Sequence, residues 1–185
     1  SNMEMISAWM YSQKDFLTEG KEVVITALPL YHIFAFVVNC LTTVKHGGHS
    51  ILITNPRDMD SFIKDLKKYP FSLMTGVNTL FNGLLNQAEI HNVDFSHLKV
   101  TVGGGMAVQK VVAEKWEKVT GCPLLEGYGL TEASPVLTTN PIGGGRIGTI
   151  GLPVPSTDIR IVDDAGNDVL LGERGEIIAA GPQVM

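Results

Sequence analysis

Residues 126–132 (Glu-Gly-Tyr-Gly-Leu-Thr-Glu) combine more potential chemistry than any other stretch of this 185-residue chain. Gly127 and Gly129 allow the backbone to turn sharply and to approach a ligand closely. The ring of Tyr128 offers a flat face on which a base can stack, and Mg²⁺ prefers oxygen ligands such as those of Thr131 and Glu132. The run therefore predicts a nucleotide site. A half-buried packing role for Tyr128 and a simple turn at Thr131 are the alternatives.

Three glycines, Gly103, Gly104 and Gly105, fall between a predicted strand and a predicted helix. Bare backbone at such a point can lie against a ring or a phosphate group. The run does not fit the dinucleotide-binding fingerprint, because Val108 occupies the position of its third glycine. A tight turn that binds nothing is the alternative.

Two other segments place polar groups where a predicted strand ends. His32 lies between a strand and a buried helix, where it can line a pocket for a carboxylate or acyl group. Thr75 and Gly76 join the next strand to a helix, and Gly76 leaves room for a ligand. The alternatives are a core histidine with satisfied hydrogen bonds and a plain turn in which Asn78 caps the following helix.

Strand and helix patterns alternate along the first part of the chain, which predicts an α/β fold with a parallel sheet flanked by helices. The predicted strands are residues 23–28, 50–54, 71–75, 98–102 and 124–125, and the predicted helices are residues 32–44, 58–69, 78–86 and 109–120. Ligands of such sheets bind outside the carboxyl ends of the strands. Three of the segments described above fall there, at residues 29–32, 103–105 and 126–132.

The chain changes character after Asn140. Glycine-rich turns separate short apolar stretches at residues 158–162, 169–171 and 176–180, which predicts a β-meander in a second small sheet. We therefore divide the chain into an α/β subdomain at residues 1–140 and the β-rich start of a second subdomain at residues 141–185.

The composition excludes several classes of function. A net charge of −5 without a basic stripe argues against nucleic-acid binding. Cys40 and Cys122 are far apart in apolar surroundings, which predicts free, buried thiols in a reducing compartment. The longest apolar stretch, residues 25–44, contains Pro29, His32 and Asn39, so it predicts a buried strand and helix rather than a membrane span.

The motifs resemble those of the adenylate-forming enzymes, which include acyl-CoA synthetases. Tyr-Gly-Leu-Thr-Glu at residues 128–132 resembles the family's adenine- and magnesium-binding motif, and Gly-Gly-Gly-Met at 103–106 its glycine-rich segment. Leu-Pro-Leu-Tyr-His at 28–32 resembles its acyl-pocket motif, and residues 150–155 and 175–177 its later core segments. Residues 53–58 and 75–81 are similar to bacterial long-chain fatty-acyl-CoA synthetases in particular.

The resemblance implies ligation of a long-chain fatty acid to coenzyme A through an acyl-adenylate made from ATP. It implies that residues 103–105 and 126–129 (Glu126 included) hold adenine, and that Thr131 and Glu132 are catalytic, with Glu132 ligating Mg²⁺. It places His32, Thr75 and Gly76 at the acyl substrate. It also implies a cytoplasmic enzyme that meets fatty acids at the inner face of the membrane.

The resemblance covers nearly the whole chain but only the middle of the family's longer sequence. The family's phosphate-binding loop, its ribose-binding aspartate and its catalytic lysine have no counterpart here. We therefore expect these residues to be a central fragment that is inactive on its own. Another acyl- or aryl-adenylating enzyme and a non-catalytic, Rossmann-like nucleotide-binding module remain the alternative interpretations.

Overall fold

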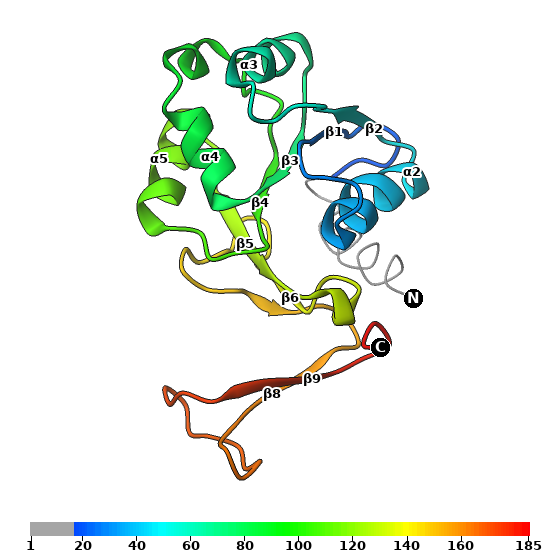
Figure 1. The fold of residues 1–185 in the computed structure, drawn as a ribbon, viewed down its shortest axis with the longest axis vertical. Coiled ribbons are helices and arrows are strands. Elements are labelled where there is room, and N and C mark those ends of the chain that lie inside the picture. Colours follow the sequence, from blue (N-terminus) through cyan, green and yellow to red (C-terminus); the bar gives the residue numbers. More distant parts are fainter. Residues whose placement is uncertain (1–16) are drawn as a thin grey trace.

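A seven-stranded sheet organises the part of the chain that the computed structural model describes, residues 17–185 (Figure 1). Its strand order is β2-β1-β3-β4-β5-β6-β7, and the first five strands run parallel. These five are β1 (Val23–Thr26), β2 (His49–Leu52), β3 (Leu73–Gly76), β4 (Val100–Gly103) and β5 (Leu124–Tyr128). All five were predicted from apolar runs, and the α/β class is confirmed.

Helices cover both faces of the sheet (Figure 1). They are the π-helix η1 (Ala35–Leu41), α2 (Thr42–Lys45), α3 (Met59–Lys68), α4 (Asn78–Leu85), the 3₁₀-helix η2 (Ala88–Asn92) and α5 (Lys110–Thr120). The strand order reverses direction at β1, and crossovers between parallel strands are right-handed. The connection through η1 and α2 therefore lies on one face, and α3, α4 and α5 pack side by side on the other.

The local sequence explains where these helices begin and end. The Asp58 side chain caps α3 by accepting a hydrogen bond from the Ser61 backbone N–H at 3.1 Å, as expected for an N-cap aspartate. Two lysines in its last turn, Lys67 and Lys68, complement the helix dipole. Helix α5 ends at Gly121, whose φ of 73° is in the left-handed region that favours glycine.

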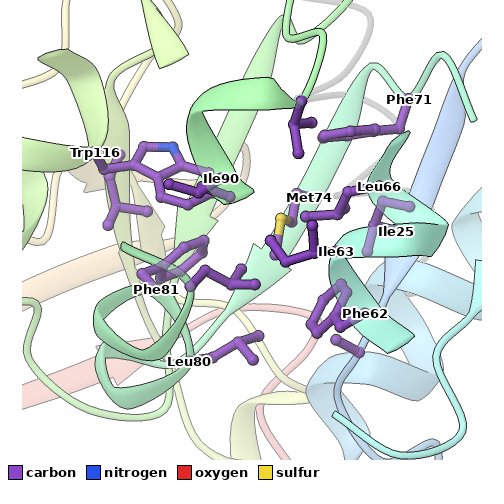
Figure 2. Packing of buried hydrophobic residues seen from close by; sticks show 14 of the residues in the cluster. Ile25, Phe62, Ile63, Leu66, Phe71, Met74, Leu80, Phe81, Ile90 and Trp116 are labelled. Atoms are coloured by element: carbon purple, nitrogen blue, oxygen red, sulfur yellow. The ribbon is translucent and has the colours of Figure 1, made fainter. Parts of the chain in front are cut away.

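The main core lies between the sheet and helices α3, α4 and α5 (Figure 2). Trp116 is fully buried there, and its ring meets that of Phe81 edge-on with centroids 4.9 Å apart. Its indole N–H donates to the Thr101 hydroxyl at 3.2 Å, so the one polar atom of this large side chain is satisfied. This packing fixes α5 against β4, whose carboxyl end leads into the three glycines.

The predicted helix at residues 32–44 contains a π-helical stretch that the sequence pattern did not reveal. Asn39, fully buried in this stretch, donates through Nδ2 to the Thr75 hydroxyl at 2.8 Å, and Thr75 donates back to Asn39 Oδ1 at 2.9 Å. The pair ties η1 to β3. Within residues 17–185, no helix has the length and apolar character needed to cross a bilayer.

Both cysteines have free thiols. Cys122 is buried at the start of β5, as predicted, and this burial raises the pKa of its thiol. Cys40 is only half-buried, so the prediction of a fully buried side chain was wrong there. It lies next to Asn39 on η1 and is not among the buried residues of that helix.

The sheet continues beyond the predicted strands. β6 (Thr138–Thr139) pairs antiparallel with β5, and β7 (Leu152–Pro153) pairs antiparallel with β6. Both strands are only two residues long, which is too short for an alternating pattern to mark them in the sequence. Because β6 pairs with Gly127 and Tyr128, β5 extends further than the predicted residues 124–125.

A separate antiparallel hairpin of β8 (Asp158–Val162) and β9 (Glu176–Ala180) projects away from the main sheet (Figure 1). The predicted strand at residues 169–171 was wrong, because the Leu170 backbone N–H donates to the Glu173 carboxylate and closes a turn there. Asp168 makes only an isolated bridge to Val162. The division of the chain at residue 140 stays a prediction.

Candidate active site

A cavity of about 320 Å³ opens at the carboxyl ends of β1, β4 and β5. This is the edge of the sheet at which ligands of open α/β folds bind. Three short runs line the cavity: residues 32–34, Gly104–Gly105 and residues 127–132. Single lining residues come from neighbouring segments, namely Val38, Val102, Pro135, Val136, Thr139 and Val154. The cavity therefore brings together segments that lie about a hundred residues apart in the sequence.

The segment that follows β5 forms one wall of this cavity. Tyr128 lines it with a ring that is 38 % exposed, and its carbonyl accepts a hydrogen bond from Leu137 N–H at 2.9 Å. Gly129 comes next, and a Cβ at this position would lie 1.7 Å from the Pro135 carbonyl oxygen. Only glycine fits, because the backbone of the returning chain passes directly over it. The aromatic ring is held at the cavity wall, where it can stack on a planar ligand.

Thr131 and Glu132 lie at the rim, in the short 3₁₀-helix η3 (Thr131–Ala133). Both residues are exposed. No interaction with another described residue occupies the Glu132 carboxylate, while its carbonyl accepts from the Met185 backbone N–H at 2.9 Å. The backbone of this acidic residue is thus fixed, and its side chain is free for a ligand.

The three glycines divide between two positions. Gly104 and Gly105 line the cavity, whereas Gly103 is buried beneath it. Gly104 is held from below by a hydrogen bond from its N–H to the Gly76 carbonyl at 3.1 Å. A Cβ on Gly104 would lie 3.1 Å from the Phe34 ring, so the bare backbone lets this ring cover the glycine.

Of the three residues expected at the acyl substrate, His32 lines the cavity and Thr75 and Gly76 do not. His32 is exposed and lines the cavity, and its Nδ1 accepts from the Phe34 backbone N–H at 3.2 Å. Thr75 is 2 % exposed, and its hydroxyl is engaged by Asn39 rather than directed into the cavity. The space beside Gly76 is filled by Leu80 and Phe81, so Gly76 supports the glycine segment without lining the cavity.

Glu126 also lies outside the cavity lining, although its two successors in the chain form part of it. It is 8 % exposed, and both oxygens of its carboxylate accept hydrogen bonds from backbone N–H groups. The structure therefore brings Gly104 and Gly105, residues 127–132 and His32 together around one cavity. Glu126 is buried next to this lining and does not contribute to it.

Sequence reasoning missed the apolar part of the wall. Ile33, Phe34 and Val38 follow His32, and Val136 and Val154 close the opposite side. Their apolar character made them indistinguishable from core residues. Ile33 and Phe34 directly follow the candidate residue His32, and this adjacency was the signal that could have identified them. The only charged side chain among the described lining residues is Glu132, if His32 is taken as neutral.

The chain matches known proteins over nearly its full length. Residues 2–185 match the family model described as AMP-binding enzyme. A long-chain-fatty-acid–CoA ligase from Yersinia pestis is 58% identical over 100% of this chain. The chain spans only 33% of that relative's length.

Solved structures agree with the fold. A benzoate CoA ligase from Burkholderia xenovorans LB400 superposes with a TM-score of 0.86 at 26% identity, covering 99% of this chain and 37% of that one. ATP-bound MatB from Rhodopseudomonas palustris superposes with a TM-score of 0.83 at 27% identity, covering 99% of this chain and 36% of that one. Both cover the α/β sheet together with the β8–β9 hairpin.

Proposed function

Because the chain belongs to the AMP-binding enzyme family, we propose that it forms the adenylate-binding centre of a long-chain-fatty-acid–CoA ligase. In the complete reaction the fatty-acid carboxylate attacks the α-phosphorus of ATP and releases pyrophosphate. The thiol of coenzyme A then attacks the acyl carbonyl, and AMP leaves. The enzyme would act in the cytoplasm and meet its fatty acid at the inner face of the membrane.

One observation carries this proposal: Gly104, Tyr128 and Glu132, which come from two different strand ends, line the same cavity. Adenine would lie between the Gly104–Gly105 segment, where Gly105 is not covered by the Phe34 ring, and the ring of Tyr128. The Thr131 hydroxyl at the rim would donate to a phosphate oxygen. His32 and the apolar residues around Phe34 would border the acyl carboxylate and the start of the chain.

Magnesium is part of the same proposal, because the Glu132 side chain fits such an ion. Its carboxylate is exposed at the rim and not occupied by another described residue, and carboxylate oxygens are preferred ligands of Mg²⁺. A bound ion would neutralise negative charge on the phosphates. No described lysine or arginine lines the cavity, so Glu132 would recruit the positive charge that this wall lacks.

The test measures the exchange of labelled pyrophosphate into ATP in the presence of different carboxylic-acid substrates. It uses the protein at the full length of its relatives, which are longer than this chain. We expect exchange with palmitate and little with benzoate. Benzoate-dependent exchange alone would replace the proposal with an aryl-adenylating enzyme. Binding of NAD without exchange by any acid would support a nucleotide-binding module instead.

A further inference from the structure

The Glu126 carboxylate is bound entirely by the protein's own backbone. Its Oε2 accepts from the Val108 N–H at 3.1 Å, and its Oε1 accepts from the Gly148 N–H at 3.0 Å. Among the described residues it has no cationic partner within ion-pair distance. Burying a carboxyl group that is only 8 % exposed would be costly without such hydrogen bonds.

The backbone carbonyl of Glu126 anchors the same region a second time. It accepts from the Asn140 backbone N–H at 3.1 Å and from Asn140 Nδ2 at 3.0 Å. Asn140, 3 % exposed, also donates to the Thr149 carbonyl at 2.6 Å and accepts from the Arg146 N–H at 3.0 Å. Residues 141–149 therefore leave and return at one buried polar cluster.

Three segments meet at this cluster, and two of them contribute residues to the cavity lining. Val108 follows the glycine segment, in which Gly104 and Gly105 line the cavity. Gly148 lies in the 141–149 loop, which does not line the cavity itself but joins the lining residues Thr139 and Val154. Glu126 itself is two residues before Tyr128 in β5. Both oxygens of its carboxylate face the two loops, and Glu126 does not line the cavity.

We infer that Glu126 is a positioning residue, which sets the shape of the nucleotide cavity by clamping residues 103–109 and 141–149 to β5 without contacting the base. This inference rests on the proposed nucleotide site. It separates Glu126 from Tyr128, which contacts the ligand directly. Substituting a residue that contacts the base and substituting one that only positions the surrounding segments have different effects on nucleotide selectivity and on amide exchange.

The first readout is amide hydrogen exchange of the full-length protein without ligand. Glu126→Gln keeps one acceptor and places an N–H₂ group against a backbone N–H, so we expect faster exchange in only one of the two segments. Glu126→Ala removes both acceptors, and exchange should rise about tenfold or more in both, because hydrogen bonds to charged groups are of that strength. Unchanged exchange in both variants would overturn the clamp.

The second readout compares ATP with inosine triphosphate, which carries a carbonyl in place of the adenine amine. A positioning role predicts that Glu126→Gln weakens both nucleotides by the same factor. A base-reading role predicts a change in their ratio, and that result would overturn the inference. Glu176→Gln is the matched control, because Glu176 is exposed on β9 and lies outside the cavity lining.

A milder variant keeps the inference testable if Glu126→Ala does not fold. Asn140→Asp removes the amide donors to the Glu126 and Thr149 carbonyls. We expect faster amide exchange in residues 141–149 and an unchanged exchange rate in residues 103–109. An equal increase in both segments would contradict the arrangement. If the unchanged protein bound neither nucleotide, the proposed function would fail while the exchange results would still test the clamp.

Discussion

At the scale of single residues, Tyr128 is the side chain whose contribution is simplest to isolate. Its ring lines the cavity and is 38 % exposed without a ligand, so it has a free face on which adenine can stack. Tyr128→Ala in the full-length protein should weaken ATP binding by about 1–3 kcal/mol, the range measured for base–aromatic stacking. Isothermal titration with ATP measures this change.

Tyr128→Phe is the matched control, because it keeps the aromatic face and removes only the hydroxyl. Its affinity for ATP should stay close to that of the unchanged protein. If the phenylalanine variant lost as much affinity as the alanine variant, the hydroxyl would be responsible, and the stacking role would have to be abandoned.

At the scale of elements, the pair Asn39–Thr75 connects the π-helix η1 to β3, and η1 is preceded by the cavity residues 32–34. Removing one partner leaves the other buried without its hydrogen bond. Thr75→Val or Asn39→Leu alone should therefore cost about 1–3 kcal/mol of the free energy of unfolding.

The double variant Asn39→Leu with Thr75→Val should cost less than the sum of the two single changes, because no partner of the pair is then left unsatisfied. Chemical denaturation of the unchanged protein, the two single variants and the double variant gives the coupling free energy between the two side chains. Strict additivity would mean that the two side chains do not act as a pair.

At the scale of the whole molecule, a partly buried ion pair at the amino ends of the strands, opposite the cavity, makes stability depend on pH. Lys99 Nζ donates to Glu22 Oε1 at 2.7 Å and joins the start of β4 to the residue before β1. Burial opposes ionisation of Glu22, but hydrogen bonds from Lys99, Ser72 and the Thr18 backbone outweigh it and lower the pKa of this carboxyl below 4.5.

A lowered pKa in the folded state means that the stabilisation is complete above the ordinary pKa of 4.5 and is lost as the pH falls through the folded value. We expect the urea midpoint to fall as the pH is lowered from 6 towards 3. Glu22→Gln should be less stable at pH 6 and should show a shallower decline. Parallel curves for the two proteins would exclude this source of acid sensitivity.

The composition of the cavity leads to a second prediction at this scale. Its described lining contains no lysine or arginine to stabilise charge on the transferred phosphate, and loss of one such donor commonly costs about 10²–10³ in rate. The 185-residue chain alone should therefore form no acyl-CoA from palmitate, ATP and coenzyme A in a chromatographic assay. Product from the purified chain would contradict this.

The elements and the site differ in how well the sequence predicts them. The five parallel strands and the helices α3 and α5 follow from apolar periodicity and from caps such as Asp58, because burial dictates those residues. Strands β6 and β7 are too short for periodicity. The π-helix contains Asn39, whose contact with Thr75 joins residues far apart in the sequence.

Gly129 was predictable because a Cβ there would lie 1.7 Å from the Pro135 carbonyl oxygen, and Tyr128 was predictable because it is the aromatic residue beside it in the same motif. The inward position of Thr75 and the backbone partners of Glu126 were not, because each depends on which neighbouring segment reaches the side chain first. Residue type limits what a side chain can bind, and the fold decides which of those partners it meets.

The attachment of residues 141–149 has a consequence for sequence variation. Glu126 and Asn140 hold this loop mainly through the peptide groups of Arg146, Gly148 and Thr149. Every non-proline residue offers the same amide and carbonyl, so most exposed side chains of the loop can be exchanged without loosening it. A single inserted or deleted residue shifts which amide faces each acceptor. Loop libraries of constant length that keep Gly143, Gly145 and Gly148 should therefore keep the loop attached to β5, because two of these glycines have positive φ and a Cβ on Gly145 would meet Leu125. Libraries of variable length should lose this attachment.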